Sequence, residues 1–337
     1  INGTPMSFDG KQTLTTLEGA TQEISQGPTA AIVPIKQLGT NGGGYFGVNS
    51  SHPLENPNAF TNMLECWSIL IIPMAMVFAL GFYLKRRKLA ACIFTVMLAA
   101  YTCGIVISVW QEMAGSPQID EMGIAQELGS MEGKEIRIGS AASAMWGMTT
   151  TVTSNGSVNS MHDSQTPLSG MLQMLNMQIN CWFGGVGVGF MNYYAFLIIA
   201  VFISGLMVGR TPEFLGKKLA SSWLNNPSFH GLSEMLYEYT SSAANNGSGF
   251  EGLSDNTPFW NITTGIVLIM GRYFPIVGPV AIAGLLAGKK FVPESAGTLK
   301  TDTATFSVMT FAVIIIVAAL SFFPALALGP IADYLTF

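Results

Sequence analysis

The sequence predicts an all-α polytopic membrane protein in which long apolar helices alternate with short helices and polar, glycine-containing loops. Only 10% of the 337 residues are charged and 49% are hydrophobic, whereas a typical soluble domain has roughly 25% charged residues. A loop rich in Gly, Asn and Ser occurs three times, each time between a short helical segment and a long apolar one. Irregular backbone at membrane depth is tolerated only where it lines a polar cavity, so the repeat predicts pore loops.

The composition also limits the classes of function. A formal net charge of −5 gives no basic surface for nucleic acid, so we expect no nucleic-acid partner. The cysteines lie in apolar stretches without CxxC spacing, and we expect small core-filling thiols and neither a zinc nor a redox site. They are Cys66, Cys92, Cys103 and Cys181. The chain begins with Ile1 and shows no signal peptide, so we expect a partial sequence.

The first unit is predicted to span residues 1–110. Its pore loop, at about residues 36–50, follows a short helical segment that ends at Leu38 and cannot cross a bilayer, since crossing takes about 20 residues. Two long apolar segments, Leu64–Leu84 and Leu89–Trp110, then form a predicted hairpin, and the second of them opens the next repeat. The basic turn between them favours the cytoplasm, so the pore loop enters from the outside.

The second unit is predicted over residues 111–218. An acidic external loop leads to a short helix at Ser140–Val152 and a second polar loop at Thr153–Asn159. The apolar stretch Leu168–Gly209 is about twice as long as a membrane span and is interrupted by Gly184–Gly189. Glycines at this depth expose backbone carbonyls, so we expect a broken helix and a gate, with close helix packing through small residues as the alternative.

The third unit is predicted over residues 219–337. It has a short helix at His230–Tyr239, a polar loop at residues 240–249, and apolar spans at Asn261–Gly288 and Thr303–Leu328. Like the other two units, it places a polar loop between a short helix and a long one. Repeated units that each contribute one loop can build a ring of carbonyls around an ion, which no single loop can do.

The predicted membrane side of successive segments is inconsistent with the number of apolar spans between them. Arg210 and the lysines after it favour the cytoplasm, whereas the third polar loop should enter from outside. No apolar span lies between them in residues 219–231. Either a helix is missing after Lys218 or the sidedness of one unit is wrong. Three loops also leave a fourfold ring open, so a fourth unit should precede Ile1 or come from another chain.

Several motifs carry a family resemblance. They are Thr40-Asn41-Gly42-Gly43-Gly44-Tyr45-Phe46, Gly156-Ser157-Val158-Asn159, Ser241–Ser248, Gly209–Lys218 and Pro324–Pro330. The first three resemble, in order, the second, third and fourth pore loops of KdpA, the potassium-transporting component of the bacterial Kdp complex. The resemblance covers essentially the whole chain. This sequence departs from the family pattern in two places, because the first repeat and the helix that should open the fourth repeat are absent.

The resemblance implies helix–pore loop–helix repeats around a pseudo-fourfold pore, with three of the four filter loops in this chain. It implies a multi-pass protein of the bacterial plasma (inner) membrane, surrounded by lipid. Such a protein binds and translocates potassium within an ATP-driven import complex and is not an enzyme by itself. The implied partners are the ATP-hydrolysing KdpB and the smaller KdpC and KdpF. The implied ligand is the potassium ion, with no organic cofactor.

The implied potassium filter takes four residues from each loop, whose carbonyls would replace the water around the ion. They are Thr40, Asn41, Gly42, Gly43, Thr153, Ser154, Asn155, Gly156, Ser242, Ala243, Ala244 and Asn245. Glycine suits such loops because it reaches backbone conformations that side chains forbid. The implied gate consists of Gly184, Gly185, Gly187, Gly189 and Arg210. The alternatives are ordinary external turns for the loops and, for Arg210, a base that extends to the cytoplasmic surface.

Two other patterns have simpler interpretations. Gly42, Gly44 and Gly47 satisfy GxGxxG, but a dinucleotide site needs a preceding strand and an amphipathic helix after it, so we do not expect one. Arg272 lies within an apolar span, where an unpaired charge is costly, and should therefore face a cavity or a partner.

Histidines and acidic residues near the loops leave further alternatives. We interpret His162 and Asp163 as hydrogen-bonding supports of a filter loop and not as a metal or catalytic pair, because no third ligand or nucleophile is placed near them. Four outer acidic residues would either concentrate cations at the entrance or simply be solvated. They are Glu55, Asp163, Glu251 and Asp255.

Two functions remain after these exclusions. The first is the ion-selective subunit of an active potassium importer, and the second is a free-standing potassium channel or uptake protein of the same fold. Pore chemistry alone does not separate them, and the resemblance favours the first. A membrane enzyme is a distant third, since the sequence has no nucleotide, phosphoryl-aspartate or nucleophile motif.

Overall fold

The structure is a computed structural model that describes residues 3–194, 228–250, 255–289 and 301–335, together with residues 196, 226 and 253. The described chain is helical apart from one two-stranded antiparallel sheet, β1 (Lys11–Thr15) and β2 (Thr21–Ser25). The α-helices are α1 (Thr29–Leu38), α2 (Ala59–Tyr83), α3 (Arg87–Ala114), α4 (Pro117–Glu121), α5 (Ser140–Val152), α6 (Pro167–Ile179), α8 (Ser228–Ala244), α9 (Pro258–Ala287), α10 (Ala304–Leu326) and α11 (Ala332–Leu335). A π-helical turn, Ala327–Ile331, joins the last two.

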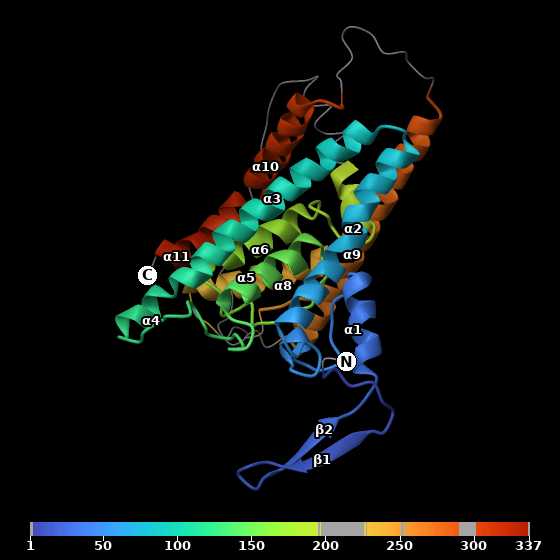
Figure 1. The fold of residues 1–337 in the computed structure, drawn as a ribbon. Helices are drawn as coiled ribbons and strands as arrows, with labels where there is room; N and C mark the ends of the chain where they lie inside the picture. The colour runs from blue at the N-terminus through green and yellow to red at the C-terminus, as the bar shows by residue number, and fades with distance from the viewer. Residues whose placement is uncertain are drawn as a thin grey trace.

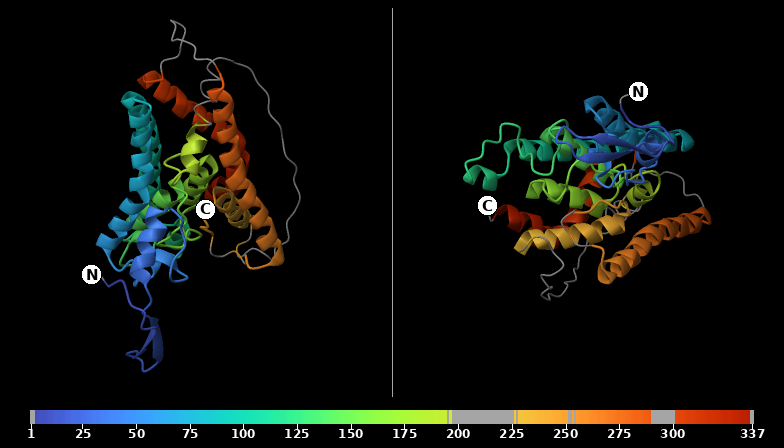
Figure 2. Two further views of the ribbon diagram at one scale, coloured as in Figure 1. Left: turned by 90° about the vertical axis from the view of Figure 1, so that its right-hand side faces the viewer. Right: turned by 90° about the horizontal axis from the view of Figure 1, so that it is seen from below.

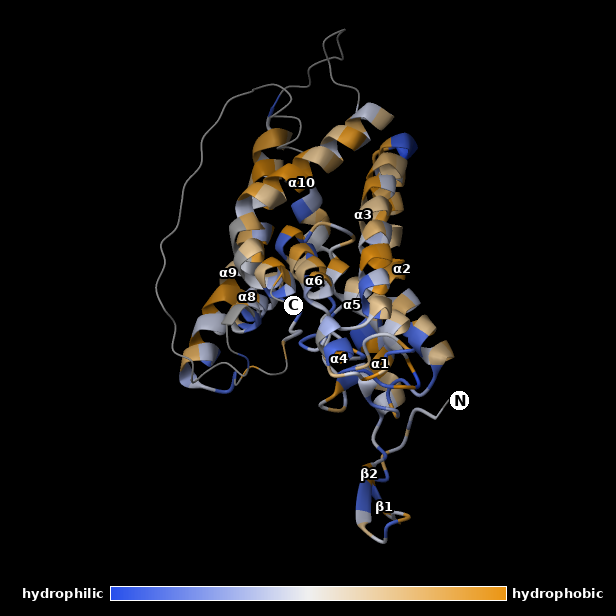
Figure 3. Ribbon diagram, turned by 90° about the vertical axis from the view of Figure 1, so that its left-hand side faces the viewer, coloured by the Kyte–Doolittle hydropathy of each residue, from blue (hydrophilic) through white to orange (hydrophobic). Residues whose placement is uncertain are grey.

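Among the described residues, four helices are long and apolar enough to cross a membrane, namely α2, α3, α9 and α10. They carry the most hydrophobic ribbon in Figure 3. The predicted all-α membrane fold is confirmed. The β-hairpin was not predicted, and it extends away from the helical body (Figure 1).

Three shorter helices, α5, α6 and α8, fill the space between the long ones. α5 packs against α3 and α6, and α8 packs against α6 and α9. α2 and α3 lie on one side of the body and α9 on the other (Figure 2). The largest core cluster joins α2, α3, α5 and α10 through residues such as Met97, Met148 and Ile314, all of which are fully buried.

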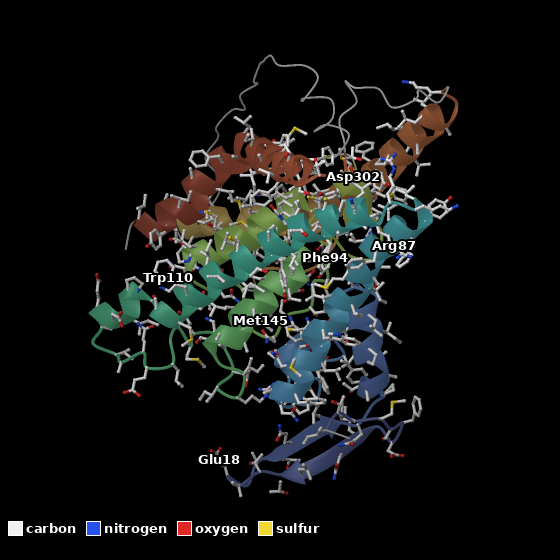
Figure 4. The ribbon with its side chains drawn as sticks, turned by 45° about the horizontal axis from the view of Figure 1, so that its top comes forward. Glu18, Arg87, Phe94, Trp110, Met145 and Asp302 are labelled. Carbon is white, nitrogen blue, oxygen red and sulfur yellow. The ribbon has the colours of Figure 1, made fainter. Side chains whose placement is uncertain are left out.

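The two ends of the body differ as the predicted sidedness requires. Arg87, at the start of α3, and Asp302, just before α10, lie at one end, and Glu18 marks the tip of the β-hairpin at the other (Figure 4). The basic turn between α2 and α3 is therefore opposite the outer segments. This arrangement fits a cytoplasmic turn and an external hairpin.

Local signals explain where individual elements begin and end. α5 has the predicted bounds, because Gly139 has a φ of 82° at its start and Thr153 leaves helical geometry at its end. α2 starts earlier than predicted, since the side chain of Asn58 accepts from the N–H of Thr61 and the Thr61 hydroxyl accepts from the N–H of Asn58 in a capping box. The predicted break is confirmed: α6 ends at Ile179, and helix resumes at residue 188.

The cysteine prediction is only partly right. Cys66 and Cys181 are buried in the core, as expected for small apolar side chains. Cys103 is instead exposed on α3, on a surface where a membrane helix would face lipid or a partner, and Cys92 is half-buried. All four are free thiols. The expected absence of a helix after Lys218 falls outside the described residues.

Candidate functional site

The helices α1, α5 and α8 end in the same hydrogen-bonded turn. The first residue of each turn is a non-glycine residue with positive φ: Thr40 (50°), Ser154 (53°) and Asn245 (58°). We call these three the cap residues. The N–H of each cap residue bonds to the carbonyl three positions back, and the next N–H to the carbonyl five positions back. This is the Schellman pattern of helix ends. Left-handed geometry costs a non-glycine residue roughly 1–2 kcal/mol, so all three turns hold strained residues.

The sequence after each cap residue also repeats. An asparagine follows, and then a glycine with positive φ, in the pairs Asn41–Gly42 (71°), Asn155–Gly156 (86°) and Asn246–Gly247 (76°). In the second and third turns the asparagine Oδ1 accepts from the N–H of the serine two residues on, at 2.8 Å for Asn155 and 3.0 Å for Asn246. The three predicted pore loops are thus structurally equivalent.

The three loops meet backbone to backbone. A Cβ atom placed on Gly42 would lie 2.1 Å from the carbonyl oxygen of Asn155 and 2.8 Å from that of Asn246. One placed on Gly156 would lie 1.5 Å from the carbonyl oxygen of Asn246. Real Cβ atoms do not approach oxygen this closely, so only glycine fits at either position. Carbonyl oxygens of two loops therefore point to the region where the third loop passes.

The second loop is fixed to the end of α1. The Nδ2 of Asn155 donates to the carbonyl of Lys36 at 3.2 Å, and the hydroxyl of Ser157 donates to Oε1 of Gln37 at 2.9 Å. The indole Nε1 of the buried Trp146 donates to the carbonyl of Ser157 at 2.8 Å. These three bonds hold the loop at Asn155 and Ser157.

A buried network of charged and polar side chains holds the last turn of α1. The ammonium of Lys36 pairs with Glu55, and Nε2 of Gln37 donates to Oε2 of Glu65 at 2.6 Å. Ser50 donates to the same Glu65 oxygen at 2.8 Å. Glu55 is only 1% exposed, so neither of the predicted alternatives, cation attraction at the entrance or solvation, applies to it.

The third loop is supported by a chain of side-chain hydrogen bonds. Nδ1 of His162 lies 2.7 Å from the Tyr237 hydroxyl, which lies 3.1 Å from the hydroxyl of Ser248. Complete burial of His162 lowers its pKa to about 3, with the Lys134 charge acting in the same direction, so the imidazole is neutral. The predicted supporting role of His162 is confirmed.

Asp163 lies in an ion-pair cluster and not at the entrance. It accepts from Nε2 of His230 at 2.9 Å, and Asp333 accepts from Nδ1 of the same ring at 3.0 Å. Burial opposes the imidazolium, but the bonds to the two carboxylates outweigh it and raise the pKa of His230 to about 10. Asp163, His230 and Glu234 could hold a metal by the spacing of their ligand atoms. Because both ring nitrogens already face carboxylates, the arrangement fits a charged imidazolium better than a metal ligand.

The loops lie between two cavities. The outer one has a volume of about 920 Å³ and reaches Asn41, Gly156 and Asn246. Its walls also carry three acidic residues, Glu135, Glu238 and Asp255. Burial and the neighbouring Asp255 raise the pKa of Glu238. Of the acidic residues predicted at the entrance, Asp255 does line this cavity; Glu251 lies outside the described residues.

The inner cavity, of about 230 Å³, lies on the opposite side of the loops. It is lined by the three cap residues, by Gly184, Gly185 and Val186, and by Arg272. Nε of Arg272 donates to Oδ1 of Asn245 at 3.0 Å. The prediction that Arg272 faces a cavity or a partner is confirmed, because it does both.

The predicted gate segment, residues 184–189, lies directly beneath the loops. The N–H of Val186 donates to the Thr40 hydroxyl at 3.1 Å. A Cβ on Gly185 would lie 2.8 Å from the carbonyl oxygen of Thr153. Gly189 bonds back to the carbonyl of Gly184 at 2.8 Å, and Gly187 to that of Gly185 at 3.0 Å, which folds the segment into a tight turn. Arg210 lies outside the described residues.

Not every predicted filter residue occupies an equivalent position. Ser242 and Ala243 belong to the last turn of α8, and their carbonyls accept hydrogen bonds from the side chain of Asn245. Asn246 and Gly247, which the sequence-based prediction omitted, take the places of Asn155 and Gly156. The signal was present in the repeated Asn-Gly-Ser of residues 155–157 and 246–248. The element directly before Gly42 is helix α1 and not a strand, which removes the dinucleotide interpretation.

Comparison with known proteins identifies the family. A family model described as the potassium-transporting ATPase A subunit, KdpA, matches residues 1–223 and 219–335. The chain belongs to this family. Potassium-binding subunits of potassium-transporting ATPases from Parabacteroides distasonis, Phocaeicola vulgatus and Geobacillus kaustophilus are 69%, 68% and 47% identical to it over 99%, 100% and 99% of the chain.

The comparison also bears on the predicted gap. The chain spans about two thirds of the length of these relatives, 66% of the first two and 65% of the third. The match to the P. vulgatus protein runs over 375 residues, more than the 337 of this chain. The two parts of the KdpA family match meet at residues 219–223. The overlap lies beside Lys218, after which either a missing helix or a wrong sidedness was expected.

Proposed function

We propose that this chain binds and translocates potassium in an ATP-driven import complex. The observation that carries the proposal is the meeting of three equivalent loops between an outer and an inner cavity, with the carbonyls of Asn155 and Asn246 beside Gly42. Relatives that are 68–69% identical are named potassium-binding subunits, which supports potassium as the ion.

In the proposed mechanism, backbone carbonyls replace the hydration shell of the ion as it passes the loops. The predicted filter residues of the first two loops keep this role. In the third loop Ala244 and Asn245 keep it, and Asn246 and Gly247 replace Ser242 and Ala243, whose carbonyls accept from the side chain of Asn245. Glu135, Glu238 and Asp255 raise the local concentration of cations in the outer cavity. The close backbone contacts fix the positions of the carbonyls. Fixed carbonyls keep the pore at one width, and a pore that collapses or widens loses its preference for one ion size.

The segment 184–189 is the proposed gate. It lies across the inner side of the loops, and its four glycines let it change conformation at small energetic cost. Arg272 adds a positive charge to the inner cavity, which opposes a dehydrated cation while the gate is shut. Arg210 remains part of the gate proposal.

The proposed partners follow from the family. They are the ATP-hydrolysing KdpB together with KdpC and KdpF, with lipid of a bacterial plasma membrane around the long helices. ATP hydrolysis is assigned to KdpB and not to this chain. The pore is pseudo-fourfold, with the units 1–110, 111–218 and 219–337 each supplying one loop and the fourth loop coming from outside this sequence.

A free-standing potassium channel of the same fold is the second candidate. Two cavities joined by a filter support passive conduction as well as they support a pump. Purification of the full-length protein from its native membrane decides between them. An ATPase chain that co-purifies supports the importer, whereas a protein that isolates alone and conducts potassium passively supports the channel.

Two neighbouring glycines test the filter. Gly42 and Gly43 both have positive φ, 71° and 77°, so alanine strains the backbone at each. Only at Gly42 would the new Cβ strike another loop, since nothing lies within 4 Å of that position on Gly43. We expect Gly42→Ala to weaken potassium binding in the assembled complex at least tenfold more than Gly43→Ala. Equal potassium affinity and unchanged discrimination over sodium in both variants would contradict the filter assignment.

A further inference from the structure

The cap residues have a property that the filter does not explain. Glycine is the residue usually found at this position of a helix end, because other residues strain the backbone there. All three positions nevertheless carry a polar side chain, and Thr40, being β-branched, is the most strained of them. A side chain that is kept against backbone strain indicates a contact that glycine would lose.

The Thr40 hydroxyl makes such a contact with the gate segment. It accepts a hydrogen bond from the N–H of Val186 at 3.1 Å and donates its own proton to the carbonyl of Gly39 at 2.8 Å. The donated bond orients the hydroxyl so that a lone pair faces Val186. Thr40 thereby connects the first filter loop to the middle of the segment.

Ser154, the equivalent residue of the second loop, holds the end of α6, just before the same segment. Its hydroxyl donates to Oδ1 of Asn180 at 2.5 Å. Asn180 ends α6 with a φ of 42° and is the residue at which the broken helix turns away. Its carbonyl accepts from Nδ2 of Asn192 at 3.0 Å, beyond the segment. Ser154 therefore fixes Asn180, the residue at which the chain leaves α6 and turns towards residues 184–189.

The third cap residue has a different partner. Asn245 bonds Arg272 of α9 and not residues 184–189. All three cap side chains are half-buried and line the inner cavity. On the side from which an ion would leave the filter, one hydroxyl thus connects the first loop to the segment and one connects the second loop to Asn180, just before it.

We propose that Thr40 and Ser154 are positioning residues of the gate, whose hydroxyls hold residues 184–189 shut beneath the filter. Opening then requires that the Val186–Thr40 and Asn180–Ser154 hydrogen bonds break together. The filter loops and the gate are coupled in this way, because any movement of a cap residue shifts the bond that holds the segment. This inference rests on the proposed function.

The test uses the full-length protein in its assembled complex, reconstituted in vesicles without ATP. Thr40→Gly removes the hydroxyl and the backbone strain together, so a purely structural role predicts no loss of stability. We expect a passive rubidium leak at least fivefold above wild type that remains larger than the sodium leak, and a melting temperature within a few degrees of wild type. Thr40→Ser, which keeps the hydroxyl, should leak less than Thr40→Gly, and Ser154→Gly should leak in the same direction as Thr40→Gly.

The outcomes separate this inference from the filter proposal. A Thr40→Gly complex as tight as Thr40→Ser overturns the positioning role. A leak that admits sodium and rubidium equally also overturns it, because the filter and not the gate has then been lost. If Thr40→Gly does not assemble, Thr40→Val, which keeps the shape and lacks the hydroxyl, decides by the same leak. Wild-type vesicles without potassium preference count against the filter proposal, whatever the variants show.

Discussion

Nζ of Lys134 lies 2.9 Å from Oε2 of Glu112, and both side chains are completely buried. Glu112 stands near the end of α3, and its other oxygen accepts from the N–H and the hydroxyl of Thr166, at 2.7 and 2.8 Å, at the start of α6. The segment that carries Lys134 also meets the chain beyond the second loop, since the N–H of Met161 bonds to the carbonyl of Gly133 at 2.8 Å. The pair therefore fastens the outer segment to α3 and to the start of α6, the helix that follows the second loop.

Glu112→Gln should be strongly destabilising. It leaves the Lys134 ammonium buried without a counter-charge, and removal of one partner of a buried pair costs about 3–5 kcal/mol. Thermal unfolding of the purified protein in detergent measures the effect. The matched control is Glu23→Gln, whose partner Lys11 lies at 2.7 Å on the exposed β-hairpin and whose loss should not change stability measurably. The double variant Glu112→Gln, Lys134→Met should recover part of the loss, and equal effects at both sites would contradict the assignment.

Stability should fall at alkaline pH through His230. The bonds to Asp163 and Asp333 raise its pKa to about 10 despite burial, whereas the unfolded chain has the ordinary value of about 6.5. A raised pKa stabilises the fold fully below pH 6.5, and this contribution is lost as the pH rises towards 10. Melting temperatures between pH 6 and pH 10 should therefore fall more steeply for wild type than for His230→Gln.

Other groups also titrate in this window, so the difference between the two proteins is the informative quantity. Asp163→Asn provides a second comparison, because it removes one of the two carboxylates and should lower the pKa of His230 and shift the loss of stability to lower pH. Parallel pH curves for wild type and His230→Gln would show that the imidazole is not charged in the folded protein.

The sequence predicted elements whose boundaries have strong local causes. The bounds of α5 were right, because a glycine with positive φ stops a helix whatever surrounds it. A break near Gly184–Gly189 was also right, but it begins earlier than predicted, since Asn180 with a φ of 42° ends α6, and helix resumes at residue 188. The early start of α2 was missed, since the Asn58 capping box is polar and lies outside the apolar pattern. The β-hairpin was missed because its strands are short and largely exposed, with no buried face to impose a pattern.

The sequence predicted which three loops form the candidate site, but not which residues of the third loop are equivalent to those of the other two. Ser241–Asn246 has no residue that marks where the helix must end, and the residues predicted for the third loop lie two positions before those that are equivalent to the predicted residues of the second loop. The pairing of Glu55 with Lys36 and of Asp163 with His230 joins residues 19 and 67 positions apart. Such long-range pairs depend on the tertiary fold, and no local pattern distinguishes them from solvated acidic residues.

Asn155 and Asn246 provide a test of whether these two residues occupy equivalent positions in the second and third loops. The two side chains are 0% and 2% exposed, and each Oδ1 accepts from the N–H of the serine two residues on. Replacement by alanine leaves those buried donors unsatisfied, at about 1–3 kcal/mol each, and frees the loop backbone that the amide had fixed. Asn246→Ala should have the larger effect, because its Oδ1 also accepts from the Ser241 hydroxyl at 2.5 Å.

The rise in melting temperature on addition of potassium measures the consequence, because a ligand that binds the folded state stabilises it according to its affinity. Both alanine variants should show a smaller rise than wild type. Asn261→Ala, on the exposed start of α9, is the control and should match wild type. If Asn246→Ala responds to potassium as Asn261→Ala does, the loop around Asn246 is not part of the ion path, and the register deduced from the three equivalent turns is wrong.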